Sequence, residues 1–456
     1  MFHPSHTNAP RIERSAELSI TRIAAPAPCP SNVLRARTRD DLPFVLRSGP
    51  GDPALTEWSY AALEPVGLAR DIAHASASLT GWVDTRAPDL PPFQGGAVGY
   101  IGYDCGWEFQ ARPRTARADP LGLEPARFSL YDAVYARNER TREGFIVAQP
   151  TLAAERRADR LRLAVASSPH RTTSEGRAST TPVPVVARAT HLDRIRRAKA
   201  RIADGEIYQV NLTYPIEARF RGMPEAVFSR LLDAPPPFSA FLDLGGERAI
   251  VSASPECFLT FDAWTRALHT FPIKGTCRRA KNADDDSRLR DRLARDPKER
   301  AEHLMIVDLE RNDLGKIAEI GSVAVEGLAY LESFPGIHHM TSSIRGTALT
   351  AVPLDAIVRA MFPGGSITGA PKLRAKEIIG TVEIEDGRST PYEIDLHAAT
   401  PTLTLSWTVE RTTQCGDVDT IRVRVTDNNR NIVSQTLHAC SDGTATIDSL
   451  RGGSFT

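Results

Sequence analysis

Runs of apolar residues along the chain predict both helices and strands. Leu192, Ile195, Ala198 and Ile202 recur at helical spacing and predict a helix that ends near Gly205. Short apolar runs predict strands at residues 42–46, 208–213, 249–252 and 257–261. Because strands and helices do not alternate strictly, the pattern favours a mixed α+β architecture.

A run of glycines and aromatic residues occupies residues 91–104, with the sequence PPFQGGAVGYIGYD. Its small residues suit close packing within a sheet. A dinucleotide-binding loop is not indicated, because no Gly-x-Gly-x-x-Gly motif opens a helix there.

The composition suggests where the chain divides. Residues 167–184 are rich in Ser, Thr and Pro and are typical of an exposed linker. We therefore expect an N-terminal region at 1–166, which begins with a loose extension and a first strand over residues 1–40, and a second region at 185–387. Residues 388–456 have a different composition, in which Thr dominates, and form an atypical tail.

Composition also narrows the class of protein. The formal net charge of the 456 residues is zero, which argues against a nucleic-acid or anionic-membrane partner. No apolar run reaches the ~20 residues that span a bilayer, and residues 1–15 lack the apolar stretch of a signal peptide. The six cysteines are scattered without a Cys-x-x-Cys pair, so we expect free thiols and a cytoplasmic location.

Lys274 is the residue with the clearest chemical signal. Only seven of the 56 basic residues are Lys, so Arg is the default cation of this chain. A Lys kept between an apolar run and a Gly-Thr turn, in FPIKGT, indicates chemistry that Arg cannot perform. A desolvated Lys can lose its proton and attack an electrophile. The alternative is a Lys at a strand end whose ammonium group reaches solvent.

The sequence DPKERAEHLMIVDL predicts a helix that begins at Asp296-Pro297. Glu299 and Glu302 lie three residues apart, so their carboxylates share one face. Such a pair suits Mg²⁺, which takes few protein ligands and relies on substrate oxygens. The alternative is a solvated acidic face beside Arg300.

The segment FPGGSITGAPK at residues 362–372 predicts a glycine-rich turn before a helix. Free backbone N–H groups at a helix start bind carboxylates or phosphates. The segment is not a P-loop, because it lacks Gly-Lys-Ser/Thr. The alternative is an ordinary tight turn and helix cap.

Together these segments resemble the chorismate-utilising enzymes. The stretches that carry the resemblance occur in family order over roughly residues 90–380, and they are PFQGGAVGYIGYD, IYQVNLTYPI, SPECFL, PIKGT, ERAEHLMIVDLERNDLGKI, FPGIHHMTSSI and FPGGSITGAPKLRAKEII. The resemblance implies a large α/β sandwich of two antiparallel sheets with outer helices, with the active site between the sheets.

The resemblance also implies roles for individual residues. Lys274 and His339 match catalytic positions, the lysine adding to C2 of chorismate and the histidine lying near the departing C4 hydroxyl. Glu302, with Glu299 nearby, matches the site of Mg²⁺, which holds the ring carboxylate. The positions that match backbone and hydroxyl donors around the substrate carboxylates are Gly275, Thr276, Gly365 and Ser366.

Within the family, the Lys of PIKGT resembles the aminodeoxychorismate synthases, whereas anthranilate synthases usually carry Ala there. This implies amination of chorismate at C4 by ammonia, giving 4-amino-4-deoxychorismate for 4-aminobenzoate and folate synthesis. The ammonia would come from a separate glutamine amidotransferase subunit, since no amidotransferase nucleophile motif occurs in the chain. The alternatives are an anthranilate synthase component I or a catalytically impaired subunit of the same family.

The resemblance fades after about residue 387. A terminal helix with a second metal-binding Glu is expected in the family, but no helical periodicity closes this chain. One hypothesis is a shift of reading frame near codon 387, which translation of the other two frames would test. The alternative is a divergent tail whose alternating residues form strands, as at 402–409 and 421–425.

Overall fold

A computed structural model describes most of the chain up to residue 384 and five strands beyond it. The described residues are 17–38, 40–87, 89–110, 121–167, 177–178, 180–246, 248–384, 393–396, 403–407, 419–426, 432–439 and 443–447. Two compact units divide the chain, one with residues 1–187 and 207–372 and the other with residues 188–206 and 373–456.

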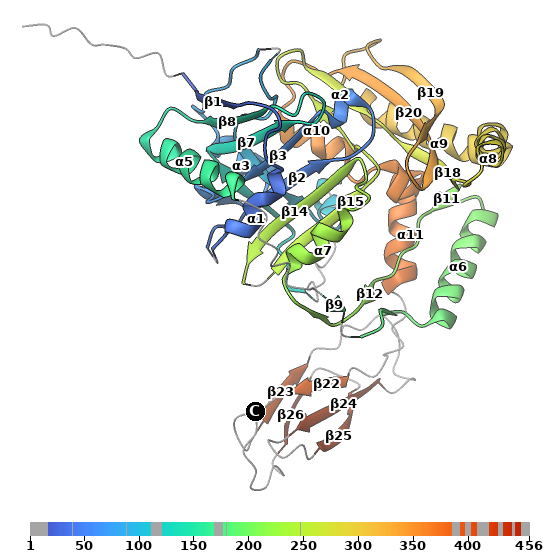
Figure 1. Cartoon of the computed structure of the whole chain (residues 1–456). Coiled ribbons are helices and arrows are strands. Elements are labelled where there is room, and N and C mark those ends of the chain that lie inside the picture. The colour runs from blue at the N-terminus through green and yellow to red at the C-terminus, as the bar shows by residue number, and fades with distance from the viewer. Residues whose placement is uncertain are drawn as a thin grey trace, which may run out of the picture. The chain divides into compact units, whose positions relative to one another are not determined.

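The first unit contains a seven-stranded antiparallel sheet (Figure 1). Its strands, in spatial order, are β1 (Ser19–Ile23), β8 (Gly144–Ala148), β7 (Ala133–Asn138), β3 (Trp58–Ala62), β2 (Phe44–Ser48), β14 (Phe238–Gly245) and β15 (Arg248–Ser254). The strands predicted at 42–46 and 249–252 fall on β2 and β15. Strands β14 and β15 follow the expected linker in sequence, so the sheet joins segments from both sides of it.

Both faces of this sheet are buried. On one face, helix α5 (Leu152–Ala166) contacts β7 and β8, and its Leu161 belongs to one apolar cluster with Tyr135 and Phe241. On the other face, Phe44 and Val134 belong to a second apolar cluster. Neighbouring residues on a strand point to opposite faces, so a strand buried on both sides is apolar at successive positions.

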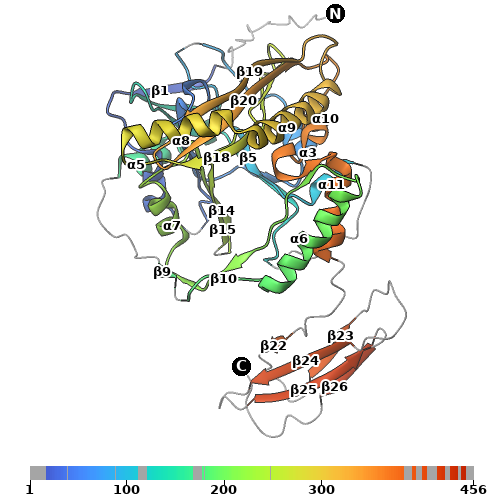
Figure 2. The same cartoon turned by 90° about the vertical axis from the view of Figure 1, so that its right-hand side faces the viewer.

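A second antiparallel sheet contains Lys274 and His339, the two predicted catalytic residues. It contains β16 (Thr260–Phe261), β17 (Ala267–Thr270), β20 (Ile337–Thr347) and β18 (Ile273–Arg278), with β19 (Ala324–Ser333) also paired to β20. Helices α8 (Ala283–Arg295) and α9 (Pro297–Gly315) lie over it (Figure 2). The strand predicted at 257–261 forms only at its last two residues. Two antiparallel sheets packed with helices confirm the predicted α+β class.

A three-stranded sheet contains the glycine-rich run. Its order is β4 (Gly67–Ala69), β6 (Ala126–Tyr131) and β5 (Gly96–Ile101). A Cβ atom on Gly99 would lie 1.9 Å from the carbonyl oxygen of Arg127. The predicted close packing is therefore confirmed, since only glycine fits there. Helices α3 (Ile72–Ser78), α4 (Cys105–Phe109) and α10 (Leu354–Met361) lie nearby.

The remaining elements of the first unit are short. They are the 3-10 helices η1 (Pro30–Asn32) and η2 (Gly365–Ile367), helices α1 (Val33–Ala36), α2 (Pro53–Thr56) and α7 (Pro224–Leu231), and the paired strands β9 (Arg177–Ala178) with β13 (Phe220–Arg221), β10 (Val183–Pro184) with β12 (Ile216–Glu217), and β11 (Gln209–Val210) with β21 (Gly369–Ala370). Of the strand predicted at 208–213, only β11 forms. Parts of the expected linker lie in β9 and β10, while residues 168–176 and 179 lie outside the described residues.

The start of α9 follows its sequence signal closely. Asp296 is the N-cap, and its carboxylate accepts hydrogen bonds from the backbone N–H groups of Lys298 and Glu299. Pro297 occupies the first turn, where no N–H is needed. The predicted helix start is therefore confirmed.

The second unit contains α6 (Arg188–Ala203), most of α11 (Lys372–Ile384) and the tail strands. Gly205, with φ of +76°, follows the end of α6, as predicted. Strands β22 (Glu393–Leu396), β24 (Asp419–Thr426) and β25 (Ile432–Ala439) form one sheet, and β23 (Leu403–Trp407) pairs with β26 (Gly443–Ile447). Strands occur at both tail positions where alternation predicted them, but this does not test the frameshift hypothesis.

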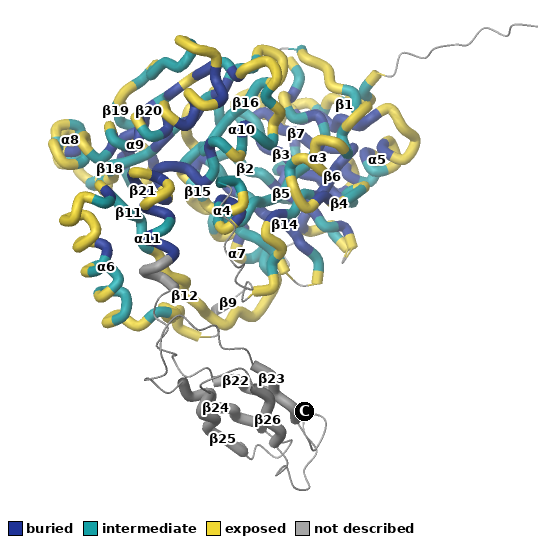
Figure 3. The backbone as a smooth tube through the Cα atoms, turned by 180° about the vertical axis from the view of Figure 1, so that it is seen from behind, coloured by how far each residue is buried: buried dark blue, intermediate teal, exposed yellow. Residues whose placement is uncertain are grey.

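Two further predictions concern the described part of the chain. The cysteines described there, at 29, 105, 257 and 277, are all free thiols, as expected, whereas Cys415 and Cys440 lie outside the described residues. None of the described helices combines the length and the apolar character that crossing a membrane requires. Burial is concentrated along the sheets, and the outer side of α8 is exposed (Figure 3).

Candidate active site

Lys274 lies at an irregularity in strand β18. Between Ile273 and Thr276, β18 advances three residues while the facing strand β20 advances two. The extra residue of this bulge falls at Lys274–Gly275, and Gly275 has φ of +89°, which glycine adopts without strain. A bulge redirects a side chain out of the regular strand pattern. Here the Lys274 ammonium group donates a hydrogen bond to the carbonyl oxygen of Ser366, at 3.0 Å.

The turn that contains Ser366, the hydrogen-bond partner of Lys274, packs against helix α9. A Cβ atom on Gly365 would lie 2.8 Å from Cδ2 of Leu309, so a larger residue would push the turn off the helix. Thr368, fully buried, has its hydroxyl 2.9 Å from the carbonyl oxygen of Gly364. These contacts bring the two predicted segments, around Lys274 and around Ser366, into one site.

Glu256 completes this part of the site, although it is not among the predicted site residues. The Ser366 hydroxyl donates to Glu256 Oε1 at 2.7 Å. Burial raises the pKa of Glu256, although Ser366, the backbone of Ile273 and the charge of Lys274 oppose the shift. A carboxyl group that keeps its proton beside a lysine can act as a general acid. The only local signal was an acidic residue within the motif SPECFL.

Thr276 and His339 form a second pair of predicted residues. They face each other on β18 and β20, and Thr276 Oγ1 lies 2.8 Å from His339 Nδ1. His339 is 6% exposed, and burial lowers its pKa, so the ring is neutral at pH 7. Its Nε2 atom is buried and has no hydrogen-bond partner among the described residues. A neutral ring with a free nitrogen is suited to contact a hydroxyl or carboxylate of a substrate.

Glu299 and Glu302 lie in the first turns of α9. Glu299 Oε2 would be 3.3 Å from a Cβ atom on Gly275, so its carboxylate lies against the bulge of β18. The Glu302 side chain is 34% exposed and forms an ion pair with Lys298 at 3.0 Å. The predicted pair therefore lies beside the lysine strand, half-exposed.

The donor set can be tested against Mg²⁺. Among the described residues, no group of three or more His, Cys, Asp or Glu side chains converges on a point. Two half-exposed carboxylates nevertheless fit Mg²⁺, because this ion keeps several waters and binds through one or two protein carboxylates plus substrate oxygens. The second metal-binding Glu expected near the end of the family's chains would fall in the tail, outside the residues with described side chains.

His303 anchors α9 next to these carboxylates. It is fully buried, and its Nε2 atom lies 2.6 Å from the hydroxyl of Ser342 on β20. Ser342 in turn accepts a hydrogen bond from the backbone N–H of Ala329. Burial lowers the pKa of His303 to about 4, so the ring is neutral. This bond fixes the helix one turn beyond Glu299 and so sets the direction in which both carboxylates point.

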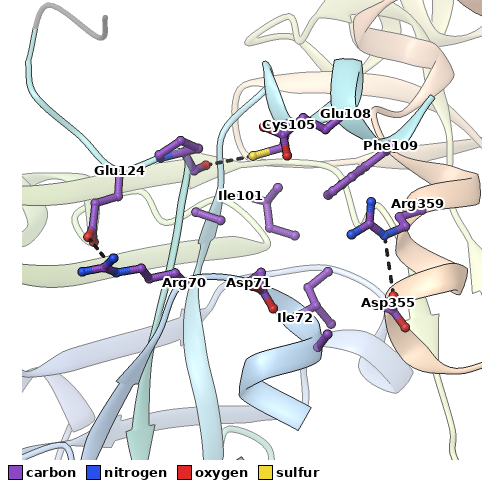
Figure 4. Close-up of a pocket in the computed structure, with 13 residues that line it drawn as sticks. Arg70, Asp71, Ile72, Ile101, Cys105, Glu108, Phe109, Glu124, Asp355 and Arg359 are labelled. Carbon is purple, nitrogen blue, oxygen red and sulfur yellow. Dashed lines mark hydrogen bonds and ion pairs between the residues drawn. The ribbon is translucent and has the colours of Figure 1, made fainter. Parts of the chain in front are cut away.

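A pocket of about 550 Å³ lies elsewhere, between α3, α4, β5 and α10 (Figure 4). Arg359 lies over the ring of Phe109, 4.7 Å from its centre, and forms an ion pair with Asp355 at 3.6 Å. Arg70 and Glu124 form another pair at 3.8 Å. None of the eight predicted site residues lines this pocket. It is therefore separate from the site built around Lys274.

Comparisons with known proteins give a consistent result. A family model described as chorismate binding enzyme matches residues 59–388. The aminodeoxychorismate synthase component 1 of Salmonella typhimurium is 39% identical over 297 residues, which are 65% of this chain and 63% of that one. The anthranilate synthase component 1 of Streptomyces coelicolor is 35% identical over 367 residues, 76% of this chain and 71% of that one.

Solved structures support the fold. The anthranilate synthase component I of Streptococcus pneumoniae superimposes with a TM-score of 0.57 at 23% identity, covering 83% of this chain and 80% of that one. The family match ends at residue 388, which agrees with the fading of the resemblance near residue 387. The chain spans just under two thirds of the length of its Salmonella relative.

Proposed function

Because this chain belongs to the family of chorismate binding enzymes, we propose that it aminates chorismate at C4 with ammonia, giving 4-amino-4-deoxychorismate. The product would serve 4-aminobenzoate and folate synthesis. The observation that carries the proposal is Lys274, which a bulge directs toward Ser366 and Glu256. A strand-end lysine that only reached solvent would not need that geometry.

Three side chains take part in the proposed reaction, namely Lys274, Glu256 and His339. The Lys274 nitrogen, once deprotonated, adds to C2 of the ring while both ring double bonds shift and the C4 hydroxyl departs. Glu256 gives that hydroxyl its proton, so that water leaves instead of hydroxide. Ammonia then adds at C4, both double bonds shift back, the C2–lysine bond breaks, and Glu256 regains a proton from the nitrogen that ammonia supplied. His339 Nε2 is available to accept or donate a hydrogen bond at the substrate.

Binding of the dianionic substrate needs positive charge and donors. Mg²⁺, when bound, would supply the charge for the ring carboxylate, and Glu302 with Glu299 would hold it. Thr276 and the turn at Gly365–Ser366 offer hydroxyl and backbone groups next to Lys274. Gly275 leaves room at the bulge, because any larger residue there would press on Glu299.

We also propose a partner that supplies ammonia. The relatives are named component 1, which implies a second subunit in those enzymes. A glutamine amidotransferase would fill that role, since no amidotransferase nucleophile motif occurs in this sequence. The free thiols of the described residues fit a reducing cytoplasm.

Turnover tests the proposal directly. The full chain is incubated with chorismate, Mg²⁺ and excess ammonium salt, and the products are separated by chromatography. We expect 4-amino-4-deoxychorismate, and we expect Lys274→Ala to lower kcat by a factor on the order of 10³ or more. Lys281→Ala, which removes an exposed lysine outside the site, is the matched control.

Two alternatives make different predictions in the same assay. An anthranilate synthase would release anthranilate and pyruvate, and Lys274→Ala would spare its activity; the 35% identity to the Streptomyces enzyme favours keeping this candidate. A catalytically impaired subunit would leave chorismate unchanged while still binding an amidotransferase. Either result would overturn the proposed amination.

A further inference from the structure

Glu310 is a buried acid that the proposed mechanism does not use. It lies on the inner side of α9 and is 3% exposed. Its Oε2 atom is 2.5 Å from the hydroxyl oxygen of Thr270 on β17, which is itself 1% exposed. Its Cγ atom would be 3.6 Å from a Cβ atom on Gly365. Glu310 therefore contacts both a strand of the catalytic sheet and the turn that carries Ser366.

The hydrogen bonds at Thr270 indicate where the proton is. The Thr270 hydroxyl oxygen lies 2.8 Å from the carbonyl oxygen of Phe258 as well as 2.5 Å from Glu310. A hydroxyl has one hydrogen, and a peptide carbonyl has none to give. Both contacts are satisfied only if Thr270 donates to Phe258 and a protonated Glu310 donates to Thr270. An ionised Glu310 would leave two acceptor oxygens facing each other at one of these contacts.

The surrounding charges also favour the neutral acid. The charged groups that act on Glu310 are Glu256, Asp313 and Lys372. The Lys372 ammonium group contacts other partners: it pairs with Asp313 and donates to the carbonyl oxygen of Met361 at 2.9 Å. Burial, the largest cause, raises the pKa of Glu310 to about 7, and Glu256 and Asp313 act in the same direction. A hydrogen bond from Thr270 and the charge of Lys372 oppose the shift without cancelling it.

Through Thr270 and Gly365, Glu310 contacts the two segments that position Glu256, the proposed catalytic acid. Phe258, whose carbonyl Thr270 holds, is two residues after Glu256 in the chain. Gly365, which packs on Glu310, immediately precedes Ser366, whose hydroxyl donates to Glu256. A change at Glu310 would therefore move the backbone that carries Glu256 and the turn that hydrogen-bonds to it.

We propose that Glu310 is a positioning residue for the amination reaction: as a neutral acid it donates to Thr270, and the chain Glu310–Thr270–Phe258 holds Glu256 in place. This inference rests on the proposed function for its catalytic consequence but not for the protonation of Glu310. When Glu310 loses its proton, Thr270 must turn its only hydrogen toward the carboxylate, and the Phe258 carbonyl loses its donor. The new negative charge then also acts on Glu256.

Infrared spectroscopy of the full chain, without substrate, tests the protonation. The spectrum of Glu310→Gln at pH 6 is subtracted from that of the unmodified protein. We expect the difference to contain the carbonyl band of a protonated carboxylic acid, which loses intensity as the pH is raised through about 7. A difference that contains only carboxylate bands at pH 6 would refute the neutral acid.

The pH dependence of turnover tests the positioning role. Gln can donate to Thr270 at every pH, so the ratio of the variant's kcat to the unmodified protein's kcat should rise by about five- to tenfold between pH 6 and 8.5, about the effect of losing one hydrogen bond. The midpoint should fall near pH 7. A ratio that stays flat over this range would overturn the role.

Two further variants separate positioning from folding. Glu310→Leu and Thr270→Val interrupt the hydrogen bonds that link Glu310 to Phe258 through Thr270, so each should lower kcat with little change in KM. Thr270→Ser keeps the hydroxyl and should have nearly the kcat of the unmodified protein. If Thr270→Ser is as impaired as Thr270→Val, the hydrogen-bond chain is not what matters. Absence of any amination product from the unmodified protein would refute the proposed function and, with it, the positioning role, while the infrared result would still decide the protonation of Glu310.

Discussion

The two ends of helix α9 use the same residue type in opposite ways. At its N-terminal end, Glu299 and Glu302 are half-exposed, and Glu302 pairs with a lysine. Glu310 lies eleven residues after Glu299, about 16 Å further along the helix axis. It is 3% exposed and hydrogen-bonded to the hydroxyl of Thr270. Eleven residues make just over three turns, so Glu299 and Glu310 lie within about 20° on the same face.

Burial decides what each carboxyl group can do. Water and a neighbouring cation stabilise the charged form at the exposed end, which suits the binding of a metal ion. Desolvation favours the neutral form at the buried end, as it does for Glu256. Under the proposed function, one helix would therefore supply both a metal-binding charge and a proton-holding acid. The following predictions test that division, from the largest expected effect to the smallest.

Glu256→Gln should give the largest loss. The amide cannot supply a proton to the departing hydroxyl, so kcat should fall by roughly 10²- to 10⁴-fold, the usual contribution of general acid catalysis. Added Mg²⁺ should not recover it, because the residue acts through its proton and not through its charge. Steady-state kinetics at several Mg²⁺ concentrations measure this, with Glu319→Gln, on an exposed acid, as the control. Recovery of activity at high Mg²⁺ would place Glu256 among the metal ligands.

Glu310→Gln should change the pH dependence of stability. The pKa of Glu310 is raised from 4.5 to about 7 in the folded protein, so the unfolded chain gives up this proton first as the pH rises. The unmodified protein therefore loses stability between about pH 4.5 and 7, and the loss is complete above that range. The variant lacks the titration and should gain on the order of 2–3 kcal/mol relative to the unmodified protein from pH 4.5 to 8.

Urea unfolding at pH 4.5, 6 and 8 measures that difference. If the two proteins differ in their free energy of unfolding by the same amount at every pH, Glu310 titrates at its ordinary pKa. In that case the proton argument at Thr270 would also fail. Glu319→Gln again serves as the control, since an exposed acid should leave the pH dependence unchanged.

The contrast along α9 also explains what could be predicted from the sequence. The helix start at Asp296-Pro297 and the end of α6 near Gly205 depend on residues within a few positions of each other, and both were predicted correctly. The close packing at Gly99 was also predicted correctly, because the glycine itself marks the position, although the carbonyl that requires it belongs to Arg127 on the neighbouring strand. The Glu299–Glu302 pair shares this local character. Lys274 stood out because Arg is otherwise the common cation.

Glu256 and Glu310 could not be assigned in the same way. Glu256 meets Ser366 across 110 positions of sequence, and Thr270 meets Glu310 across 40. Neither contact leaves a local pattern, and burial of an acid is a tertiary property. The eleven-residue spacing from Glu299 to Glu310 was a signal that could have placed both on one face. The strand predicted at 208–213 was too long for a related reason: Asn211 donates its backbone N–H to Thr368 in the glycine-rich segment, beyond the two residues of β11.

Glu302→Gln should test the exposed end of the helix. Loss of one carboxylate should raise the Mg²⁺ concentration for half-maximal activity by at least about tenfold, because even outer partners of metal ligands have effects of 10- to 100-fold. In contrast to Glu256→Gln, saturating Mg²⁺ should restore most of kcat. The measurement is activity over a range of Mg²⁺ concentrations. Equal loss at all of them would remove Glu302 from the metal site.

Lys298→Met should have the smallest effect, and in the opposite direction. Lys298 forms an exposed ion pair with Glu302 at 3.0 Å, so its ammonium competes with a metal ion for the same carboxylate. Solvent screens an exposed ion pair strongly, so removing the competitor should lower the Mg²⁺ requirement by a few-fold at most. Glu302 is the chief cause that raises the pKa of Lys298, as expected for two opposite charges in contact. A higher Mg²⁺ requirement in this variant would mean that Lys298 holds Glu302 in its metal-binding position instead of competing for it.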